Sequence, residues 1–270
     1  MIDLVVDPKS ITRAPRSVEQ WAARFQPDEL PVLDATATRL EEYRAIEDEV
    51  DAHLLAETIA GDPLMTLKLL AHVGRMRRRR DGGDPETVTA ALVMLGITPF
   101  FRAFGPQPGA SECLGDRPAA VAGFEAVLER SRRAARFALG FAVHRLDHDA
   151  AVIHEAALLH DFAELLLWLR APDLAQEVAR RQATDPALRS KDAQREVLNV
   201  ELQDVQHLLM TQWRLPELLV RITGNHHRDS AQVRNVLLAI RLARHSARGW
   251  DNAALPDDIR EIASLLNLGA

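Results

Sequence analysis

The sequence predicts an all-α fold made of many helices, and three observations lead to this class. Apolar residues recur at helical spacing from about residue 31 nearly to the end of the chain. Proline and glycine stand where helices start and stop. β-Branched residues do not alternate with polar ones over a useful length, as a strand would require. With 270 residues, of which 47% are hydrophobic and only 5% aromatic, we expect a sizeable core built mainly from Leu, Ala, Val and Ile.

Helix boundaries can be placed in chain order from capping residues. Ser17 and Gln20 have the spacing of a capping box and predict a short helix. Gly96, which follows an apolar stretch, predicts a helix end. A proline at the first helical position, behind a capping residue or a leucine, predicts four further helix starts. These starts lie at Asp62-Pro63, Asp84-Pro85, Leu215-Pro216 and Leu255-Pro256.

The longest predicted helix covers residues 119–146. At 100° per residue it has a broad apolar face and an opposite side that carries several Glu and Arg residues. Arg130 is the exception, because its angle places it on the flank of the apolar face. An unpaired charge would be costly there, so Arg130 needs a partner. The apolar face consists of Phe124, Val127, Leu128, Ser131, Ala135, Ala138 and Ala142.

The segment between residues 105 and 118 is rich in glycine and proline and predicts a boundary between two helical lobes. We therefore expect an N-terminal extension, a domain made of an N-terminal lobe and a central lobe, and a C-terminal helix. In that order these parts cover residues 1–26, 27–248 (with lobes at 27–105 and 118–248) and 249–270.

The composition excludes several functional classes. Acidic residues outnumber basic ones, 39 to 33, and the net charge of −6 argues against a dedicated nucleic-acid or anionic-membrane binder. Cys113 is the single cysteine, which excludes a disulfide or a cysteine-based zinc site within one chain. The longest nearly apolar run, residues 90–101, is shorter than the roughly 20 residues that cross a bilayer. Because no secretory signal opens the chain, we expect a soluble, cytoplasmic protein.

The sharpest chemical signal is the dipeptide His160-Asp161, which we place inside a helix that continues to Trp168. A histidine ring nitrogen and a neighbouring carboxylate can bind one divalent metal ion. Glu164 follows one turn after His160 and could approach the same site. A histidine bonded to a neighbour within a helix is the common alternative, so the dipeptide alone does not establish a metal site.

Other stretches give this dipeptide a context. An apolar helix that ends in His160-Asp161, followed downstream by residues 213–216 (Trp-Arg-Leu-Pro) and by His226-His227, resembles the HD superfamily of helical proteins. From about residue 27 to about residue 248, the chain more narrowly resembles the HDOD domain, the HD-related output domain of bacterial signalling proteins. The resemblance implies a multi-helix, HD-like bundle. Its motifs are, in order, Glu29-Leu30-Pro31-Val32-Leu33, Ala60-Gly61-Asp62-Pro63-Leu64, residues 90–96 and residues 155–167.

The resemblance also implies a catalytic site that can be checked position by position. Catalytic HD proteins are phosphohydrolases that hold a metal with a His on an earlier helix, the His-Asp pair, and an Asp on a later helix. Arg130 stands in place of the earlier His, and Ile240 stands in place of the later Asp. A further His of the two-metal members falls near Leu202. His160 and Asp161 alone match the pattern.

These departures predict a degenerate metal site. A metal ion that activates water needs about three protein ligands and an open position, and arginine cannot ligate a cation. We therefore expect the guanidinium of Arg130 to pair with Asp161 in place of the metal, so that Arg130→Ala would destabilise the protein by a few kcal/mol. The residues that could still hold a weakly bound metal or a ligand are His160, Asp161, Glu164, His226 and His227.

The densest basic run begins at Arg75, near the end of a predicted helix. Cations there suit the negative pole of the helix dipole, whereas a phosphate-binding patch for nucleic acid is the alternative. We favour the first interpretation because no aromatic residue interleaves with the run and Asp81 and Asp84 follow it. The run consists of Arg75, Arg77, Arg78, Arg79 and Arg80.

The sequence therefore predicts a non-catalytic bacterial regulatory protein, which binds a signalling partner or a small ligand through a helical surface or the cavity of the lost metal site. No cofactor, membrane or nucleic acid is expected. The alternative from the enzyme class is a metal-dependent phosphohydrolase acting on a nucleotide or cyclic dinucleotide. That alternative requires ligands other than those assigned at Arg130 and Ile240. A nucleic-acid-binding adaptor that uses the arginine run is the weakest interpretation.

Overall fold

The computed structural model describes residues 10–76, 85–185, 187–223, 230–247 and 249–268. In these ranges the chain forms sixteen α-helices and two short 3-10 turns, and one isolated bridge between Val32 and Gly109 is the sole β-type pairing. The predicted all-α class is confirmed. No described helix is both long enough and apolar enough to cross a membrane. The helices are α1 (Val18–Ala22), α2 (Asp34–Ala45), α3 (Ala52–Ile59), α4 (Pro63–Met76), α5 (Val88–Leu95), α6 (Ile97–Ala103), α7 (Ala110–Leu114), α8 (Pro118–His144), α9 (Ala150–Leu159), α10 (Phe162–Arg170), α11 (Pro172–Thr184), α12 (Ser190–Leu198), α13 (Leu202–Gln212), α14 (Glu217–Thr223), α15 (Ala231–His245) and α16 (Leu255–Leu265).

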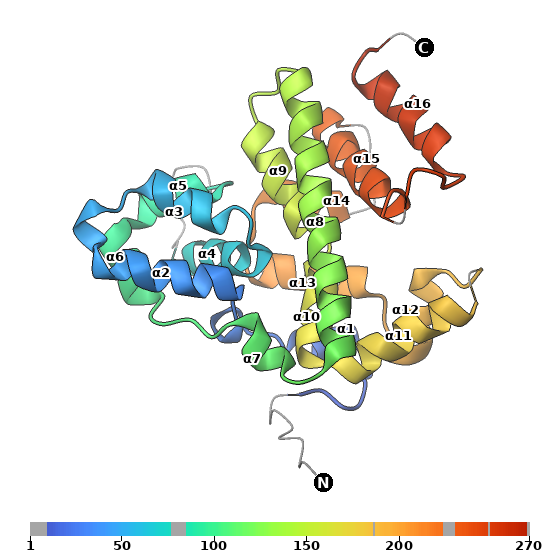
Figure 1. Ribbon diagram of the computed structural model, residues 1–270, viewed down its shortest axis with the longest axis horizontal. Helices are drawn as coiled ribbons and strands as arrows, with labels where there is room; N and C mark the ends of the chain where they lie inside the picture. The colour runs from blue at the N-terminus through green and yellow to red at the C-terminus, as the bar shows by residue number, and fades with distance from the viewer. Residues whose placement is uncertain (1–9, 77–84, 186, 224–229, 248, 269–270) are drawn as a thin grey trace.

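In Figure 1, α2 to α6 lie on one side of α8, the longest helix, and α11, α12, α15 and α16 lie on the other side. Helices α2 to α6 form the first group, and α9 to α16 form the second. The groups are not independent, because one hydrophobic core extends through both, from Ile11 near the start to Ala243 in α15. A smaller apolar cluster joins α16 to α15 and to Phe137 and Phe141 of α8. Helix α8 packs mainly on α9 and α15 of the second group, whereas α4 of the first group contacts α9.

Helix α8 follows its sequence prediction to within two residues at either end. All seven residues assigned to its apolar face are buried, and α9 and α15 are the helices that pack on it most extensively. Gly123 lets α8 approach α10 closely, because a Cβ atom at this position would overlap the indole ring of Trp168. Local periodicity was sufficient to predict this helix because its burial pattern is regular over its whole length.

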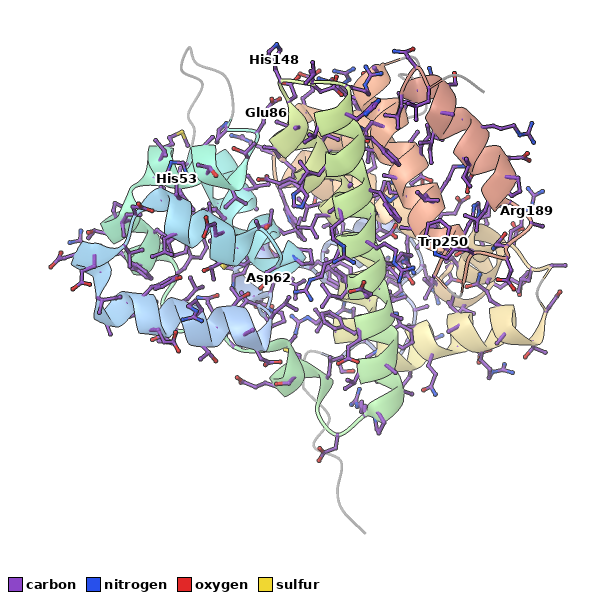
Figure 2. The ribbon with its side chains drawn as sticks, turned by 45° about the horizontal axis from the view of Figure 1, so that its top comes forward. His53, Asp62, Glu86, His148, Arg189 and Trp250 are labelled. Atoms are coloured by element: carbon purple, nitrogen blue, oxygen red, sulfur yellow. The ribbon has the colours of Figure 1, made fainter. Side chains whose placement is uncertain are left out.

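Several predicted helix ends are confirmed. Ser17 caps α1 by accepting a hydrogen bond from the third amide of the helix at 3.3 Å. Asp62 is buried and caps α4, where its Oδ1 accepts two first-turn amides at 2.8 and 3.1 Å. Its Oδ2 accepts the amide of Leu33 at 2.8 Å, which ties α4 to the start of α2. Gly96 ends α5 at φ +83°. Figure 2 shows Asp62 at the inner edge of the first group, beside α8.

The four proline starts have different outcomes. Pro63 and Pro256 lie in the first turns of α4 and α16, as predicted. Pro85 is not the first residue of α5, because Thr87 caps that helix with its side chain and α5 begins one residue later. Pro216 precedes α14, and its carbonyl accepts the first hydrogen bonds of that helix. Proline marks the neighbourhood of a helix start, whereas the capping group determines the starting residue.

Residues 10–26 pack onto the rest of the fold. Trp21 of α1 is fully buried, and its Nε1 donates a hydrogen bond to the carbonyl of Leu198 at 2.9 Å. Helix α1 lies against α13. The amide of Ile11 donates to the carbonyl of Arg170 at 2.6 Å. The described part of the predicted extension, residues 10–26, therefore covers part of the core.

Candidate functional site

The chain turns sharply at His160-Asp161. The single helix predicted through this dipeptide is wrong, because α9 ends at Leu159 and α10 begins at Phe162. The carbonyl of Asp161 accepts the amide of Glu164 at 3.0 Å and so starts α10. The prediction failed because the apolar pattern is continuous across the break, whereas the break is fixed by contacts with other helices. Asp161 thus stands at the N-terminal end of α10.

The carboxylate of Asp161 lies between two arginines. Arg130 of α8 donates from Nε to Oδ2 at 2.9 Å, and Arg244 of α15 donates from Nη2 to Oδ1 at 2.6 Å. The Nδ1 atom of His160 lies 2.9 Å from the same Oδ1. The side chains of Asp161 and Arg130 are 10% and 19% exposed, so their ion pair is shielded from water. The pairing expected between Arg130 and Asp161 is therefore present.

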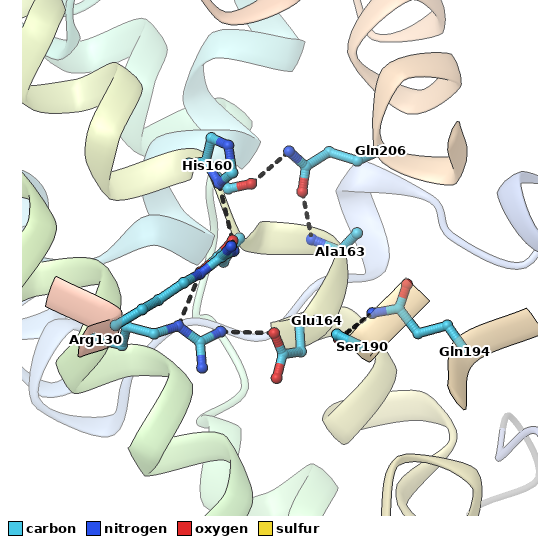
Figure 3. A network of polar contacts seen from close by, with 9 residues as sticks. Arg130, His160, Ala163, Glu164, Ser190, Gln194 and Gln206 are labelled. Carbon is cyan, nitrogen blue, oxygen red and sulfur yellow. Dashed lines mark hydrogen bonds and ion pairs between the residues drawn. The ribbon is translucent and has the colours of Figure 1, made fainter. Parts of the chain in front are cut away.

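A second carboxylate and an amide complete the network (Figure 3). Nη2 of Arg130 donates to Oε2 of Glu164 at 2.6 Å, so one guanidinium joins both carboxylates of α10's first turn. Gln206 of α13 stabilises the break between α9 and α10 through two hydrogen bonds. Its Oε1 accepts a hydrogen bond from the amide of Ala163 at 3.2 Å, and its Nε2 donates one to the carbonyl of His160 at 2.5 Å. Helices α8, α10, α13 and α15 meet here.

The electrostatics of the pair favour full ionisation. Burial acts to raise the pKa of Asp161, but the positive charges of Arg244 and Arg130 outweigh it and hold that pKa well below its usual range. Burial acts to lower the pKa of Arg130, and the carboxylates of Asp161 and Glu164 outweigh it and raise that pKa. The carboxylate of Asp161 is therefore ionised at neutral pH, and it is held by two arginines, which are always charged.

A cavity of about 440 Å³ opens beside this network. Side chains from α8, α10, α11, α12, α13 and α15 line it, together with His160 at the break. Apart from Ala163 and Leu202, every lining side chain is charged or carries an amide, hydroxyl or imidazole group. The network of Arg130, Asp161 and Arg244 forms part of its wall. The arrangement therefore offers many hydrogen-bonding groups around a space large enough for a small molecule.

The structure brings together most of the residues assigned from the sequence, but not Ile240. Leu202 lines the cavity, as do His160 and Glu164. Ile240 is buried in the hydrophobic core, and Arg244, about one helical turn later, contacts Asp161 instead. The placement of Ile240 at the family's later Asp stays a prediction, because an amphipathic pattern does not show which turn of a helix lies opposite a distant residue. His226 and His227 lie outside the described residues.

Arg244 and Gln206 are the site residues that sequence reasoning missed. Arg244 stands 40° around the helix from Ile240, so the two residues lie near the same face of α15, about one turn apart. Gln206 acts through its amide on the backbone of the break, which was itself not predicted. No local signal marks such a contact, because it depends on how α13 packs against α10.

The basic run has a structural role at the one position that the structure describes. Arg75 lies at the end of α4 and forms two hydrogen bonds, at 2.9 and 2.5 Å, with the carboxylate of Asp28. That arginine is engaged with an acidic side chain of its own chain. The other four arginines of the run, residues 77–80, lie outside the described residues.

The side chains around Asp161 do not fit a divalent metal ion. Both carboxylate oxygens of Asp161 accept hydrogen bonds from guanidinium groups, and Glu164 is bonded to Arg130. Within the described ranges, no three His, Cys, Asp or Glu side chains are arranged to hold a metal. Two fixed positive charges also repel a cation from this position. The donor set is therefore that of a salt-bridge network.

Comparisons with known proteins match this chain to one protein family. A family model of the HDOD domain matches residues 30–229. The MmoQ response regulator from Methylococcus capsulatus str. Bath is 19% identical, with 88% of this chain and 98% of that chain covered at a TM-score of 0.64. A virulence factor from Campylobacter jejuni subsp. jejuni is 18% identical, with 93% and 90% covered at a TM-score of 0.65. An HDOD domain protein from Geobacter sulfurreducens is 15% identical, with 94% and 88% covered at a TM-score of 0.50.

At these identities the solved structures establish the fold alone. None of the curated proteins matches the chain. The family match covers the site from α8 to the end of α14, whereas Arg244 lies beyond the matched residues.

Proposed function

The chain belongs to the HDOD domain family, and from this premise we propose that it is a non-catalytic regulatory protein of a bacterial signalling system, acting in the cytoplasm. An HDOD domain fits a signalling or HD-related role, and one structural neighbour is a response regulator. On this proposal the protein acts by binding a partner protein or a small ligand at the cavity beside Asp161.

One observation carries this proposal: two guanidinium groups bind the carboxylate that the HD resemblance would assign to a metal ion. Activation of water by a metal requires ligand atoms with free lone pairs and an open coordination position. Guanidinium groups have no lone pair to donate and are always charged. The ion pairs of Asp161 therefore support a site that recognises and does not hydrolyse.

The test is a hydrolysis assay with the full chain. The protein is incubated with Mn²⁺, Fe²⁺ or Mg²⁺ and with bis(4-nitrophenyl) phosphate, nucleoside monophosphates and cyclic dinucleotides. We expect no product above the buffer blank for the wild type or for Asp161→Asn. Turnover by the wild type that is lost in Asp161→Asn would contradict the proposal and support the metal-dependent phosphohydrolase. Asp161→Asn also controls for a contaminating enzyme, whose activity would persist in the variant.

A further inference from the structure

We propose that the groove between α8 and α15, which α16 fills in this structure, is a docking surface for an acidic amphipathic helix of a partner protein, and that such a helix binds by displacing α16. The side chains of α8 and α15 that hold α16 lie outside the lining of the cavity beside Asp161. The groove is therefore distinct from that cavity, and its role does not depend on whether the protein hydrolyses a phosphate ester.

Helix α16 packs on a small apolar cluster of its own. This cluster is separate from the hydrophobic core that extends through the rest of the fold, although Phe137 and Phe141 of α8 border both. Figure 1 shows α16 at the outer edge of the fold, beside α15. Departure of α16 would therefore leave the main core in place. The cluster consists of Leu238 and Leu242 of α15 and of Leu255, Ile262 and Leu265 of α16.

The connector between α15 and α16 adds few contacts that would hold α16 in the groove. Its described residues, 247 and 249–254, are exposed or half-buried, and Trp250 is 67% exposed. Among the described residues, the hydrogen bonds of the connector stay within it and the adjoining ends of α15 and α16. Its start is fixed, because Nη1 of Arg133 in α8 donates to the carbonyl of Ser246 at 2.9 Å. Helix α16 can therefore leave the groove while α15 stays in position.

A buried carboxylate anchors α16 to α15. The side chain of Asp258 is fully buried, and its Oδ1 accepts a hydrogen bond from Nη2 of Arg241 at 2.6 Å. Its Oδ2 lies 2.5 Å from Nδ1 of His245. Arg241 also donates two hydrogen bonds, at 2.9 Å each, to the carboxylate of Glu261. Charge-assisted hydrogen bonds of this kind are directional, so the groove selects an acidic residue at one position of the bound helix.

The groove and the helix that fills it carry opposite charges. Arg241 and His245 face α16 from α15, and Arg145 of α8 donates to the carbonyl of Leu265 at 2.7 Å. Helix α16 itself has three acidic residues and one basic residue. A helix without an acidic residue would bury the guanidinium of Arg241 against hydrocarbon, which costs free energy. The groove therefore fits a helix with apolar residues at i, i+7 and i+10 and an acidic residue at i+3, the spacing that α16 has from Leu255 onward.

Helix α16 and a partner helix would compete for the groove. Tethering gives α16 a high effective concentration, so a partner binds only the fraction of chains whose groove is open. A substitution that weakens α16 without changing the groove raises this fraction and tightens binding of the partner. Two isoleucines of α16 provide a matched pair for such substitutions, because Ile262 is 8% exposed and Ile259 is 51% exposed.

The test measures the fluorescence anisotropy of a labelled synthetic peptide of residues 252–268 as the full chain is added. We expect saturable binding that is about tenfold tighter for Ile262→Asp than for the wild type or for Ile259→Asp. A peptide with Asp258→Lys should not bind, because Arg241 repels a lysine. Circular dichroism verifies that each variant is folded.

Hydrogen exchange of the wild type tests the displacement of α16 without any substitution. We expect the amides of α16 to be protected at least about a hundredfold less than those in the middle of α8, because α16 opens locally. Equal protection of the two helices overturns the inference, since α16 would then leave the groove only when the whole protein unfolds.

The binding experiment has further outcomes that decide the matter. Tighter binding of the peptide by Ile262→Asp alone supports the proposal. Absence of binding to Ile262→Asp at up to about 1 mM, or equal tightening by Ile259→Asp, overturns it. A wild-type dimer that sediments as a monomer in Ile262→Asp would overturn the assignment to a partner protein, because α16 of a second copy would then fill the groove. Turnover in the hydrolysis assay bears on the site at Asp161 alone, so the groove and the proposed function can fail separately.

Discussion

Replacing Arg130 by alanine is the perturbation that the site geometry constrains most closely. The variant removes the bonds from Arg130 to Asp161 at 2.9 Å and to Glu164 at 2.6 Å. Breaking a buried ion pair costs about 3–5 kcal/mol, because it leaves a buried charge unpaired. Here Arg244 still neutralises Asp161, and the side chain of Glu164 is 35% exposed, so water can solvate part of it. We therefore expect a loss of about 2–3 kcal/mol of unfolding free energy.

Equilibrium unfolding in urea, followed by circular dichroism, measures this loss. The matched control is Arg136→Ala, which lies on the same helix and removes a pair with Glu129 whose side chains are 62% and 55% exposed. A surface pair contributes little, so we expect this control to change stability by under about 0.5 kcal/mol. Equal effects of the two substitutions, or a loss below about 0.5 kcal/mol for Arg130→Ala, would refute the description of Arg130 as a buried counter-charge.

Two further predictions concern groups away from the cavity. Burial raises the pKa of Glu155 to about 8, and the hydrogen bond from the Val88 amide offsets only part of this rise. The folded state therefore keeps a proton that the unfolded chain releases, and stability falls as pH rises between the two pKa values. In urea unfolding, the free energy of unfolding of Glu155→Gln should rise relative to that of the wild type by a few kcal/mol between about pH 5 and about pH 8. A difference between the two proteins that does not change with pH would contradict the raised pKa of Glu155. Gly123→Ala should destabilise by about 1–2 kcal/mol because its methyl group meets the Trp168 ring, whereas Gly140→Ala, with open space on the same helix, should stabilise by up to about 1 kcal/mol. Stabilisation by both alanines would show that α8 and α10 are not in close contact.

The parts of the fold that depend on local pattern could be predicted from the sequence. The buried face of α8 is periodic over its length, so both its burial and the exceptional position of Arg130 could be derived from angles alone. The choice of Asp161 as the partner of Arg130 came from the HD resemblance, which puts Arg130 in place of a metal ligand beside that carboxylate. The position of Arg130 needs only helix geometry, and its need for a partner follows from the cost of burying a charge.

What depends on packing between distant helices could not be predicted. The second arginine on Asp161 comes from α15, and only the placement of that helix distinguishes Arg244 from Ile240. The break at His160 is stabilised by Gln206 of α13. The sequence around His160 does not indicate this contact, because Gln206 is distant along the chain. Glu155 is different, since an acidic residue inside the apolar stretch of α9 was a visible signal of a buried carboxylate.

The metal content of the purified full chain tests the central claim most directly. The protein is produced with manganese, iron and zinc supplied, and its metal is measured by elemental mass spectrometry beside a His160→Ala variant. Because guanidinium groups occupy the carboxylate of Asp161, we predict metal well below one equivalent per chain, and no difference between the two proteins. Near-stoichiometric metal that is lost in His160→Ala would contradict the account and show that Asp161 exchanges its arginines for a metal ion.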